Sequence, residues 1–358
     1  MSASASPAVL PFRDIAIGDR PAVGGKGASL GELTRAGIRV PPGFVVATGA
    51  YARFLAGIDP EGRIAGTVQG LAADDVLAIS RACEGIRERI ATAPMPPDLE
   101  EAIARGYAEL SAGGGGDAVA VRSSATSEDS SEASFAGLQD TYLWVRGEAE
   151  VLRAVRNCWA SLYSAESVSY RLNRKLPEEG LAMGVVVQRM VESRCSGVMF
   201  TRSPLTGDRS VIAVEGSWGL GSAVVSGEVT PDKYVINKVT GEIVRRTVSH
   251  KTVMHVPDHR AGGVREEPVP LERRDAACLA DDEIAELAET GKRVEKHYGC
   301  PQDIEWAFAP DGGTERLFLL QSRPETIWAN KEVGPAAAPK ARAYDHVFAM
   351  LGSRGRAS

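Results

Sequence analysis

Two short stretches near the C-terminal end of the chain constrain its fold most: QDIEWAF at residues 302–308 and LFLLQSRPET at residues 317–326. The segment between them, PDGGTER at residues 310–316, contains an Asp-Gly pair followed by a second glycine. An Asp-Gly pair between two such stretches is a strong signal for a β-hairpin turn. We therefore predict that the two stretches are strands that fold back on each other.

The polar side chains of this hairpin suit a metal ion and a phosphate. Because successive side chains of a strand point to opposite faces, Asp303 and Glu305 share one face of the first strand. One face of the second strand is expected to carry four side chains: Leu317, Leu319, Gln321 and Arg323. Carboxylate and amide oxygens suit Mg²⁺, and a guanidinium suits a phosphate. The hairpin therefore predicts a metal–nucleotide site.

The composition bounds the class of protein. The chain has 358 residues, so two or three domains are expected at roughly 100–200 residues each. The hydrophobic fraction of 44% and the charged fraction of 25% are ordinary for a soluble globular protein. The net charge of −6 gives no electrostatic argument for binding nucleic acid or an anionic membrane.

Cysteine spacing and the N-terminal residues indicate the compartment. The five cysteines form no CxxC pair, which favours free thiols in a reducing environment. No apolar run approaches the ~18 residues of a membrane span, and the N-terminus lacks the basic and apolar regions of a signal peptide. We expect a cytoplasmic protein without a membrane partner.

Hydrophobic periodicity and turn residues outline further elements. A helix is predicted over residues 28–36, and an amphipathic helix over residues 282–297. Residues 118–145 are expected to form a strand, a long polar loop and a second strand. Residues 183–191 and 195–204 are predicted to form a hairpin.

The glycine run Gly24-Gly25-Lys26-Gly27 precedes the first predicted helix. Glycines let backbone N–H groups approach phosphate oxygens, a helix N-terminus favours anions, and Lys26 adds a positive charge. The run lacks the GxxxxGK[ST] pattern of a Walker A motif. It is interpreted either as a phosphate loop or as a plain glycine turn.

Arg122 ends the strand that opens the segment of residues 118–145, and hydroxyl side chains follow it directly. Such a loop offers a cation, hydroxyls and amides to an anion, or it is simply an exposed polar loop. Further along, Gly137 would allow a ligand to approach closely, and Thr141 offers another hydroxyl.

Two more segments suit a nucleoside. Gln188, Met190 and Val191 lie between two apolar strands, where backbone groups suit a purine edge and the apolar side chains suit its faces; the alternative is ordinary core. Glu215, in a glycine-rich segment, borders a ribose or belongs to a turn. None of the five histidines lies in a recognisable catalytic motif.

Taken together, an ordered series of segments resembles the nucleotide-binding domain of phosphoenolpyruvate synthase, pyruvate phosphate dikinase and rifampicin phosphotransferase. The resemblance covers roughly residues 12–327 and rests on these segments: GGKGASLGEL, VPPGFVVAT, VRSSATSEDSSEASFAGLQDTYLWV, CWASLYS, VVVQRMVESRCSGVMFTRSPLTGD, GLGSAVVSGEVTPDKYVI and DIEWAF with LFLLQSRP. It implies an α+β protein with the ATP-grasp fold, in which two lobes surround a nucleotide.

The resemblance also divides the chain. Residues 1–11 are expected to be a loose N-terminus, and residues 12–204 the N-terminal lobe or lobes with the phosphate loops. Residues 205–330 are expected to form the C-terminal lobe with the metal site, and residues 331–358 a linker and tail.

The resemblance assigns roles to individual residues, with ATP and Mg²⁺ as cofactors. Lys26 and Arg122 resemble phosphate-binding cations, and Arg323 resembles the arginine that stabilises the phosphate under attack. The loop from Gly137 to Thr141 resembles a lid over the phosphates. The remaining roles are an adenine hinge and a metal site: Gln188 to Val191 for the hinge, Glu305 and Gln321 as Mg²⁺ ligands, and Asp303 as their support.

This family normally continues into a swivelling domain whose histidine accepts the phosphoryl group, and into a domain for the second substrate. Neither is recognisable here, and Ser249-His250 is not interpreted as that acceptor. We expect either a subunit of a split enzyme, as in phenylphosphate synthase, or an excised domain. The partner would be a subunit bearing the phosphohistidine, with a small-molecule acceptor, such as phenol, bound elsewhere. A nucleotide-sensing module and a carboxylate–amine ligase are the alternatives.

Overall fold

The fold is described from a computed structural model. It describes these residues: 7–111, 118–126, 129–130, 133–134, 140–310, 316–326 and 328. The chain divides into two compact units, Met1–Glu325 and Thr326–Ser358. The statements that follow concern the described residues of the first unit. The expected tail, residues 331–358, lies outside the described residues.

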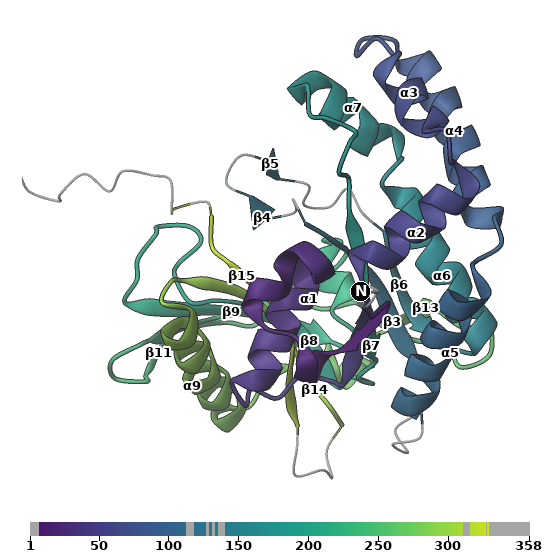
Figure 1. The fold of residues 1–358 in the computed structure, drawn as a ribbon. Coiled ribbons are helices and arrows are strands. Elements are labelled where there is room, and N and C mark those ends of the chain that lie inside the picture. Colours follow the sequence, from purple (N-terminus) through teal and green to yellow (C-terminus); the bar gives the residue numbers. More distant parts are fainter. Residues whose placement is uncertain are drawn as a thin grey trace, which may run out of the picture. The chain divides into compact units, whose positions relative to one another are not determined.

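The first unit contains two larger antiparallel sheets (Figure 1). The first has five strands in this order: β1 (Val9–Pro11), β2 (Gly43–Val46), β7 (Met183–Arg189), β3 (Val119–Ala125) and β6 (Thr141–Val145). The second has six strands in this order: β11 (Ile243–Thr247), β10 (Asp232–Asn237), β9 (Val211–Trp218), β8 (Cys195–Phe200), β14 (Gln302–Phe308) and β15 (Leu317–Pro324). Two small hairpins complete the described strands: β4 (Asp129–Ser130) with β5 (Ala133–Ser134), and β12 (Val253–Pro257) with β13 (Val264–Pro268).

The helices are interspersed with these strands. They are α1 (Arg20–Arg35), α2 (Thr48–Ile58), α3 (Arg63–Gln69), α4 (Val76–Thr92), α5 (Pro97–Ser111), α6 (Glu148–Ser161), α7 (Ala165–Arg174), α8 (Ser222–Val225) and α9 (Asp281–Tyr298). Short 3-10 turns occur at Phe12–Asp14, Ile17–Asp19 and Leu271–Arg273. This mixture of helices with antiparallel sheets confirms the α+β class. Among the described helices, none combines the length and the hydropathy required to cross a membrane.

Each large sheet has its own apolar core. Helices α2 to α7 pack with the five-stranded sheet, as the buried series Ile79, Cys83, Ile86 and Ile90 along α4 illustrates. Helix α9 packs against β8, β9 and β14 of the six-stranded sheet. Trp306 is fully buried in that second core.

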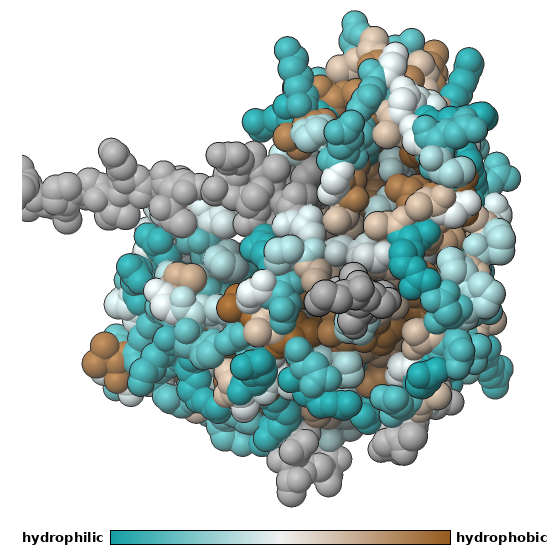
Figure 2. All heavy atoms as spheres, in the orientation of Figure 1, coloured by the Kyte–Doolittle hydropathy of each residue, from teal (hydrophilic) through white to brown (hydrophobic). Residues whose placement is uncertain are grey.

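The amphipathic helix predicted over residues 282–297 is confirmed as α9. Its apolar residues, which include Ile284, Leu287 and Val294, are buried against the sheet. Gly299 ends the helix in the left-handed conformation, at φ = 71°. On the face drawn in Figure 2, hydrophilic residues predominate over the region of α9 and its neighbouring strands.

The predicted hairpin of residues 183–191 with residues 195–204 is wrong. Strand β7 pairs with β2 and β3, whereas β8 pairs with β9 and β14. Both strands are central in their sheets, so neither has an edge left for the other. The connection over residues 190–194 instead leads from one sheet into the next. The chain thus passes from one sheet to the other at residues 190–194. The lobe boundary predicted between residues 204 and 205 stays a prediction.

The glycine run lies within α1 rather than before a helix. Gly24 adopts φ = 74° and ψ = 176°, which interrupts the helix, and the chain resumes its helical course after it. The helix predicted over residues 28–36 is therefore the second part of a longer, kinked element. Glycine suits the kink because a left-handed φ is costly for a residue with a Cβ.

Candidate functional site

The hairpin formed by β14 and β15 is confirmed, and its register brings the predicted polar residues together. Asp303 lies opposite Arg323, and Glu305 lies opposite Gln321. The alternate residues of β14, Ile304 and Trp306, are buried in the core of the six-stranded sheet. One face of the hairpin is therefore apolar, and the other carries the polar residues.

A β-bulge corrects one detail of this hairpin. Trp306 pairs with Leu319, whereas its neighbour Glu305 pairs with Gln321, so Leu320 is an extra residue in β15. The extra residue reverses the alternation: Leu319 is buried in the core, whereas Gln321 lies on the face of Glu305. The prediction that Leu317 and Leu319 share a face with Gln321 and Arg323 is wrong for this reason.

Arg122, from the five-stranded sheet, reaches this polar face. Its Nη2 atom donates hydrogen bonds to Oε2 of Glu305 at 2.9 Å and to Oε1 of Gln321 at 2.5 Å. Its Nη1 atom donates to the carbonyl of the bulge residue Leu320 at 3.1 Å. The Arg122 side chain is only 11% exposed. One guanidinium thus joins the two predicted metal ligands and the bulge.

The Arg122 contacts test whether the donor set suits Mg²⁺. A carboxylate oxygen and an amide oxygen converge on one positively charged nitrogen, so the same two oxygens suit a small cation. Among the described residues there is no group of three or more His, Cys, Asp or Glu side chains able to hold a metal. Proteins commonly bind Mg²⁺ through one or two side chains together with substrate phosphates, and the oxygens of Glu305 and Gln321 fit such a pair.

A row of cross-strand neighbours continues the polar face over the six-stranded sheet. From β15 to β10 the row consists of Gln321, Glu305, Val198, Glu215 and Lys233. Directly opposite residues of antiparallel strands share a face, so Glu215 lies on the same face as Glu305, with one valine between them. The Glu215 carboxylate is partly exposed and pairs with Lys233 at 3.1 Å.

Asp303 and Arg323 form the next row of the hairpin. Nε of Arg323 lies 3.5 Å from Oδ2 of Asp303, and the Arg323 side chain is 45% exposed. Burial raises the pKa of Asp303 to about 6, although Arg323 acts in the opposite direction. The buried Oδ1 atom of Asp303 has no hydrogen-bond partner. The Asp303 carboxylate thus takes up a proton more readily than an ordinary aspartate.

The glycine run is fastened to the strand that carries Arg122. Ser124 Oγ accepts a hydrogen bond from the Gly27 N–H at 3.0 Å and donates one to the Val23 carbonyl at 2.8 Å. A Cβ at Gly24 would lie 1.9 Å from the Ser124 carbonyl oxygen. This close approach explains the glycine. Lys26 precedes Gly27, whose N–H is hydrogen-bonded to Ser124 of β3, the strand that also carries Arg122.

The charge of Lys26 acts on Cys158 of α6. Burial is the main cause that raises the pKa of the Cys158 thiol; Asp140 adds to it, and the Lys26 charge acts in the opposite direction. Helix α1 is tied to the hairpin as well, because Ser29 Oγ donates to the Ser322 carbonyl at 2.6 Å. Helix α1 therefore contacts both strands that carry the candidate site, β3 and β15.

The predicted nucleoside residues have mixed placements. The Gln188 side chain is buried in the five-stranded sheet and donates to the Pro41 carbonyl at 3.4 Å, so it lies in the core. The Met190 N–H donates to the Ala118 carbonyl at 3.0 Å. Val191 follows in the connection between the two sheets, where its carbonyl accepts from Ser193 Oγ at 3.2 Å.

The predicted lid is described only at its end. Thr141 is exposed in the edge strand β6 and lies directly opposite Arg122. Gly137 lies outside the described residues. The role of both residues over a phosphate stays a prediction.

Residues that the sequence interpretation missed include Leu320 and Ser124. The four consecutive apolar residues of LFLL conceal the apolar–polar alternation of this strand, so the sequence gives no clear signal of the bulge. Ser124 was noted only as one hydroxyl of a polar loop. Its contact with the glycine run joins residues about a hundred positions apart, which no local pattern reveals.

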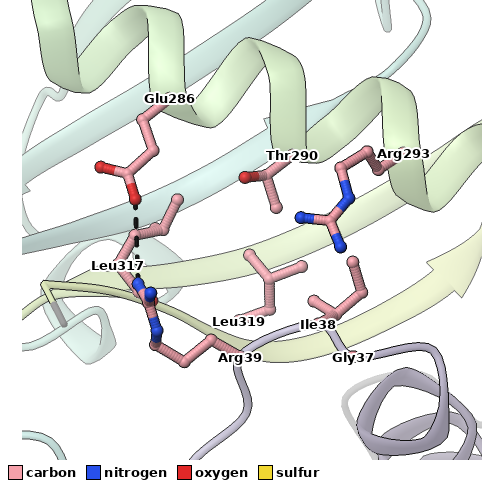
Figure 3. Close-up of a pocket in the computed structure, with 8 residues that line it drawn as sticks. All are labelled: Gly37, Ile38, Arg39, Glu286, Thr290, Arg293, Leu317 and Leu319. Carbon is pink, nitrogen blue, oxygen red and sulfur yellow. Dashed lines mark hydrogen bonds and ion pairs between the residues drawn. The ribbon is translucent and has the colours of Figure 1, made fainter.

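A cavity of about 390 Å³ lies at the outer edge of β15, on the core-facing side of the hairpin (Figure 3). Arg39 forms an ion pair with Glu286 of α9 at 3.8 Å, and its side chain donates to the Leu317 carbonyl at 3.2 Å. The Leu319 N–H donates to the Arg39 carbonyl at 2.9 Å. The segment around Arg39 thus covers the edge of β15 and holds the hairpin from its outer side.

Comparisons with known proteins show the family to which the chain belongs. The family model described as pyruvate phosphate dikinase, AMP/ATP-binding domain, matches residues 20–343. The chain is 43% identical over 343 residues to a probable phosphoenolpyruvate synthase of Staphylothermus marinus. The matched region covers 89% of this chain and 41% of that protein. It is 44% identical over 317 residues to the probable phosphoenolpyruvate synthase of Methanothermobacter thermautotrophicus, with 88% of this chain and 45% of that protein covered. The phosphoenolpyruvate synthase of Escherichia coli is 41% identical over 342 residues (92% and 43%). The chain spans less than half the length of these relatives.

Proposed function

Because the chain belongs to the pyruvate phosphate dikinase AMP/ATP-binding domain family, we propose that it binds Mg-ATP and positions it for phosphoryl transfer to a histidine on another domain or subunit. The observation that carries the proposal is the convergence of Glu305, Gln321 and Arg122 on one point. These residues unite two metal-type oxygens and a phosphate-type cation, and they come from both large sheets.

In this proposal the nucleotide lies between two lobes of an ATP-grasp fold, with one large sheet in each. Glu305 and Gln321 hold Mg²⁺, which when bound neutralises phosphate charge. Lys26, Arg122 and Arg323 stabilise the negative charge that develops during transfer, since phosphoryl transfer depends on positioning and charge neutralisation. Asp303 orients Arg323.

The base and sugar would lie further along the same face. The connection after β7, with Met190 and Val191, contacts the adenine, and Glu215 contacts the ribose. The position of Glu215 in the row of Glu305 supports this assignment. The buried side chain of Gln188 supports a structural role for that residue, so its contribution would come from its backbone. The loop from Gly137 to Thr141 would cover the phosphates.

The reaction follows from the dikinase type. The histidine attacks the β-phosphorus of ATP, and the bond to the α-phosphate breaks, which gives AMP and a pyrophosphoryl-histidine. Water then releases the terminal phosphate and leaves phosphohistidine for the final acceptor. Two versions differ in that acceptor. The names of the relatives favour pyruvate, in a phosphoenolpyruvate synthase of which this chain is the ATP-binding part. A split phenylphosphate synthase would use phenol.

The test mixes the chain with a histidine-bearing domain, either from a neighbouring gene or from a phosphoenolpyruvate synthase, and follows the ³¹P signals of the nucleotides. We expect ATP to be converted to AMP, with loss of the reaction in Arg323→Ala. Formation of ADP would contradict the proposal and favour a ligase. Tight ATP binding without transfer to any histidine-bearing partner would favour a nucleotide-sensing module.

A further inference from the structure

A second pocket, of about 830 Å³, lies at the edge of the five-stranded sheet. It is lined by β6, by the outward residues of α6 and by the hairpin of β12 with β13. Four arginines line it: Arg146, Arg153, Arg260 and Arg265. The lining carboxylates are Glu150 and Glu266. The lining side chains therefore include more arginines than carboxylates, although three carboxylates beside the lining also pair with it: Glu267 with Arg265, Glu228 with His255 and Glu192 with His259.

Trp144, in the wall of this pocket, has an unusual backbone. It adopts φ = 57°, in the left-handed region, which is rare for a bulky residue. The register of β3 with β6 shifts between Val119 and Val121, so Trp144 lies at a β-bulge of the edge strand. Left-handed residues and bulges of this kind concentrate at binding sites, where the surrounding structure holds them.

The indole of Trp144 is almost completely buried, since the residue is only 4% exposed. Its Nε1 atom is buried without a hydrogen-bond partner, as are the Nε1 atoms of Trp159 and Trp306 in the two cores. Trp144 therefore serves the pocket as a fixed apolar wall rather than as a hydrogen-bond donor.

Contacts around Trp144 show that the pocket wall is assembled from separate elements. The Arg146 guanidinium lies 5.6 Å from the Trp144 ring centre, and Arg146 Nη2 lies 3.4 Å from Nδ1 of His259. The His259 ring meets the Trp144 ring edge-on at 5.5 Å. The Gly263 N–H, at the tip of the β12–β13 hairpin, donates to the Trp144 carbonyl at 3.3 Å.

We propose that this pocket binds a small phosphate-type oxyanion, with arginine side chains as its donors and the Trp144 ring as the surface that holds Arg146 in place. Guanidinium groups bind phosphate oxygens through paired hydrogen bonds. Arg153 and Arg265 already have carboxylate partners, Glu150 and Glu267. Arg146 and Arg260 are therefore the arginines assigned to the anion.

This anion site is distinct from the hairpin site. Neither Glu305, Gln321 nor Arg323 lines the pocket. The two sites approach each other at Thr141, which lines the pocket and lies opposite Arg122 in the sheet. The proposal does not depend on the proposed reaction, and its test uses no nucleotide.

The test follows the indole N–H signals of the ¹⁵N-labelled chain during a titration with inorganic phosphate at constant ionic strength. The chain has five tryptophans, and Trp144→Phe identifies the signal of Trp144. We expect a saturable shift of that signal with phosphate and none with chloride. Arg260→Gln, at an exposed position, should weaken phosphate binding about tenfold, since it removes a charged hydrogen-bond donor.

Two variants serve as controls. Arg81→Gln, an exposed arginine on α4, and Glu305→Gln, in the hairpin site, should leave the phosphate titration unchanged. The absence of a saturable shift, or equal affinity in Arg260→Gln, would overturn the proposal. Loss of the shift in Glu305→Gln would also overturn it, because phosphate would then act through the hairpin site.

Discussion

Nη2 of Arg122 lies 2.9 Å from Oε2 of Glu305, which links strand β3 of the five-stranded sheet to strand β14 of the six-stranded sheet. The same nitrogen binds Oε1 of Gln321. Arg122 thus holds the two oxygens that the proposed function assigns to Mg²⁺. Binding of Mg-ATP would exchange these contacts, with the metal taking the oxygens and the phosphate taking the guanidinium.

Replacement of Arg122 tests this exchange. We expect Arg122→Gln to weaken Mg-ATP binding by about 10- to 100-fold, since a charged hydrogen-bond donor to phosphate is lost. The affinity of Arg122→Lys for Mg-ATP should lie between that of the unchanged chain and that of Arg122→Gln, because lysine keeps the charge but not the planar pair of donors. Calorimetric titration with Mg-ATP measures both. An affinity in Arg122→Gln equal to that of the unchanged chain would contradict the role of Arg122.

The bulge at Leu320 makes a separate prediction. Deletion of Leu320 would restore simple alternation and turn Gln321 and Arg323 toward the core side of β15. We expect the deletion to abolish Mg-ATP binding. Leu320→Ala keeps the residue count and the carbonyl that accepts from Arg122, so it should bind Mg-ATP nearly normally. Similar binding by both variants would show that the bulge has no part in the site.

Asp303 predicts a pH dependence of stability. Its pKa is raised to about 6 in the folded protein, above the value of an unfolded chain, so the folded state binds the proton more tightly. The contribution of Asp303 is therefore most favourable below about pH 4 and is lost as the pH rises toward and past 6. At about 1.4 kcal/mol per pKa unit, the change amounts to up to about 3 kcal/mol.

Asp303→Asn removes this titration. In urea unfolding at pH 4.5 and pH 7.5, we expect the unchanged chain to lose stability relative to Asp303→Asn as the pH rises. Arg323→Ala should enlarge the effect, because Arg323 lowers the pKa of Asp303. A stability difference between the two chains that is independent of pH would refute the assignment.

The stability losses of alanine variants at two glycines test the close contact between α1 and β3. Gly24 and Gly37 both have positive φ, 74° and 67°. A Cβ at Gly24 would overlap Ser124, whereas a Cβ at Gly37 meets nothing within 4 Å. Gly37→Ala should lower the free energy of unfolding by about 1–2 kcal/mol, from backbone strain alone. Gly24→Ala should lower it by clearly more, as measured by thermal or urea unfolding. Equal losses would argue against close contact between α1 and β3.

The sequence predicts local features of this protein well. The β14–β15 hairpin follows from Asp-Gly and alternation, and α9 follows from its apolar spacing and from Gly299, because these signals depend on neighbouring residues. Features that depend on distant residues were missed. One such feature is that β7 and β8 belong to different sheets, because an apolar run does not reveal which strands will pair with it.

The candidate site divides in the same way. Asp303, Glu305, Gln321 and Arg323 come together within one hairpin, and the sequence anticipates that they gather on one surface, although not which residues lie opposite each other. The contact of Arg122 with that hairpin spans almost two hundred residues and arises from how the two sheets lie within the unit. The left-handed backbone of Trp144 has no counterpart in any sequence pattern, since it arises at a bulge in the pairing of β3 with β6.

The most direct test of the account is the Mg²⁺ dependence of ATP binding to this chain. Calorimetric titrations with ATP, in Mg²⁺ and in EDTA, would be compared for the unchanged chain, Glu305→Gln and the control Arg81→Gln. We predict tight binding with Mg²⁺ and at least tenfold weaker binding in EDTA, a difference that Arg81→Gln retains and Glu305→Gln largely loses. ATP affinity that is the same with and without Mg²⁺, or a Mg²⁺ effect that survives in Glu305→Gln, would contradict the claim that the β14–β15 hairpin holds the metal.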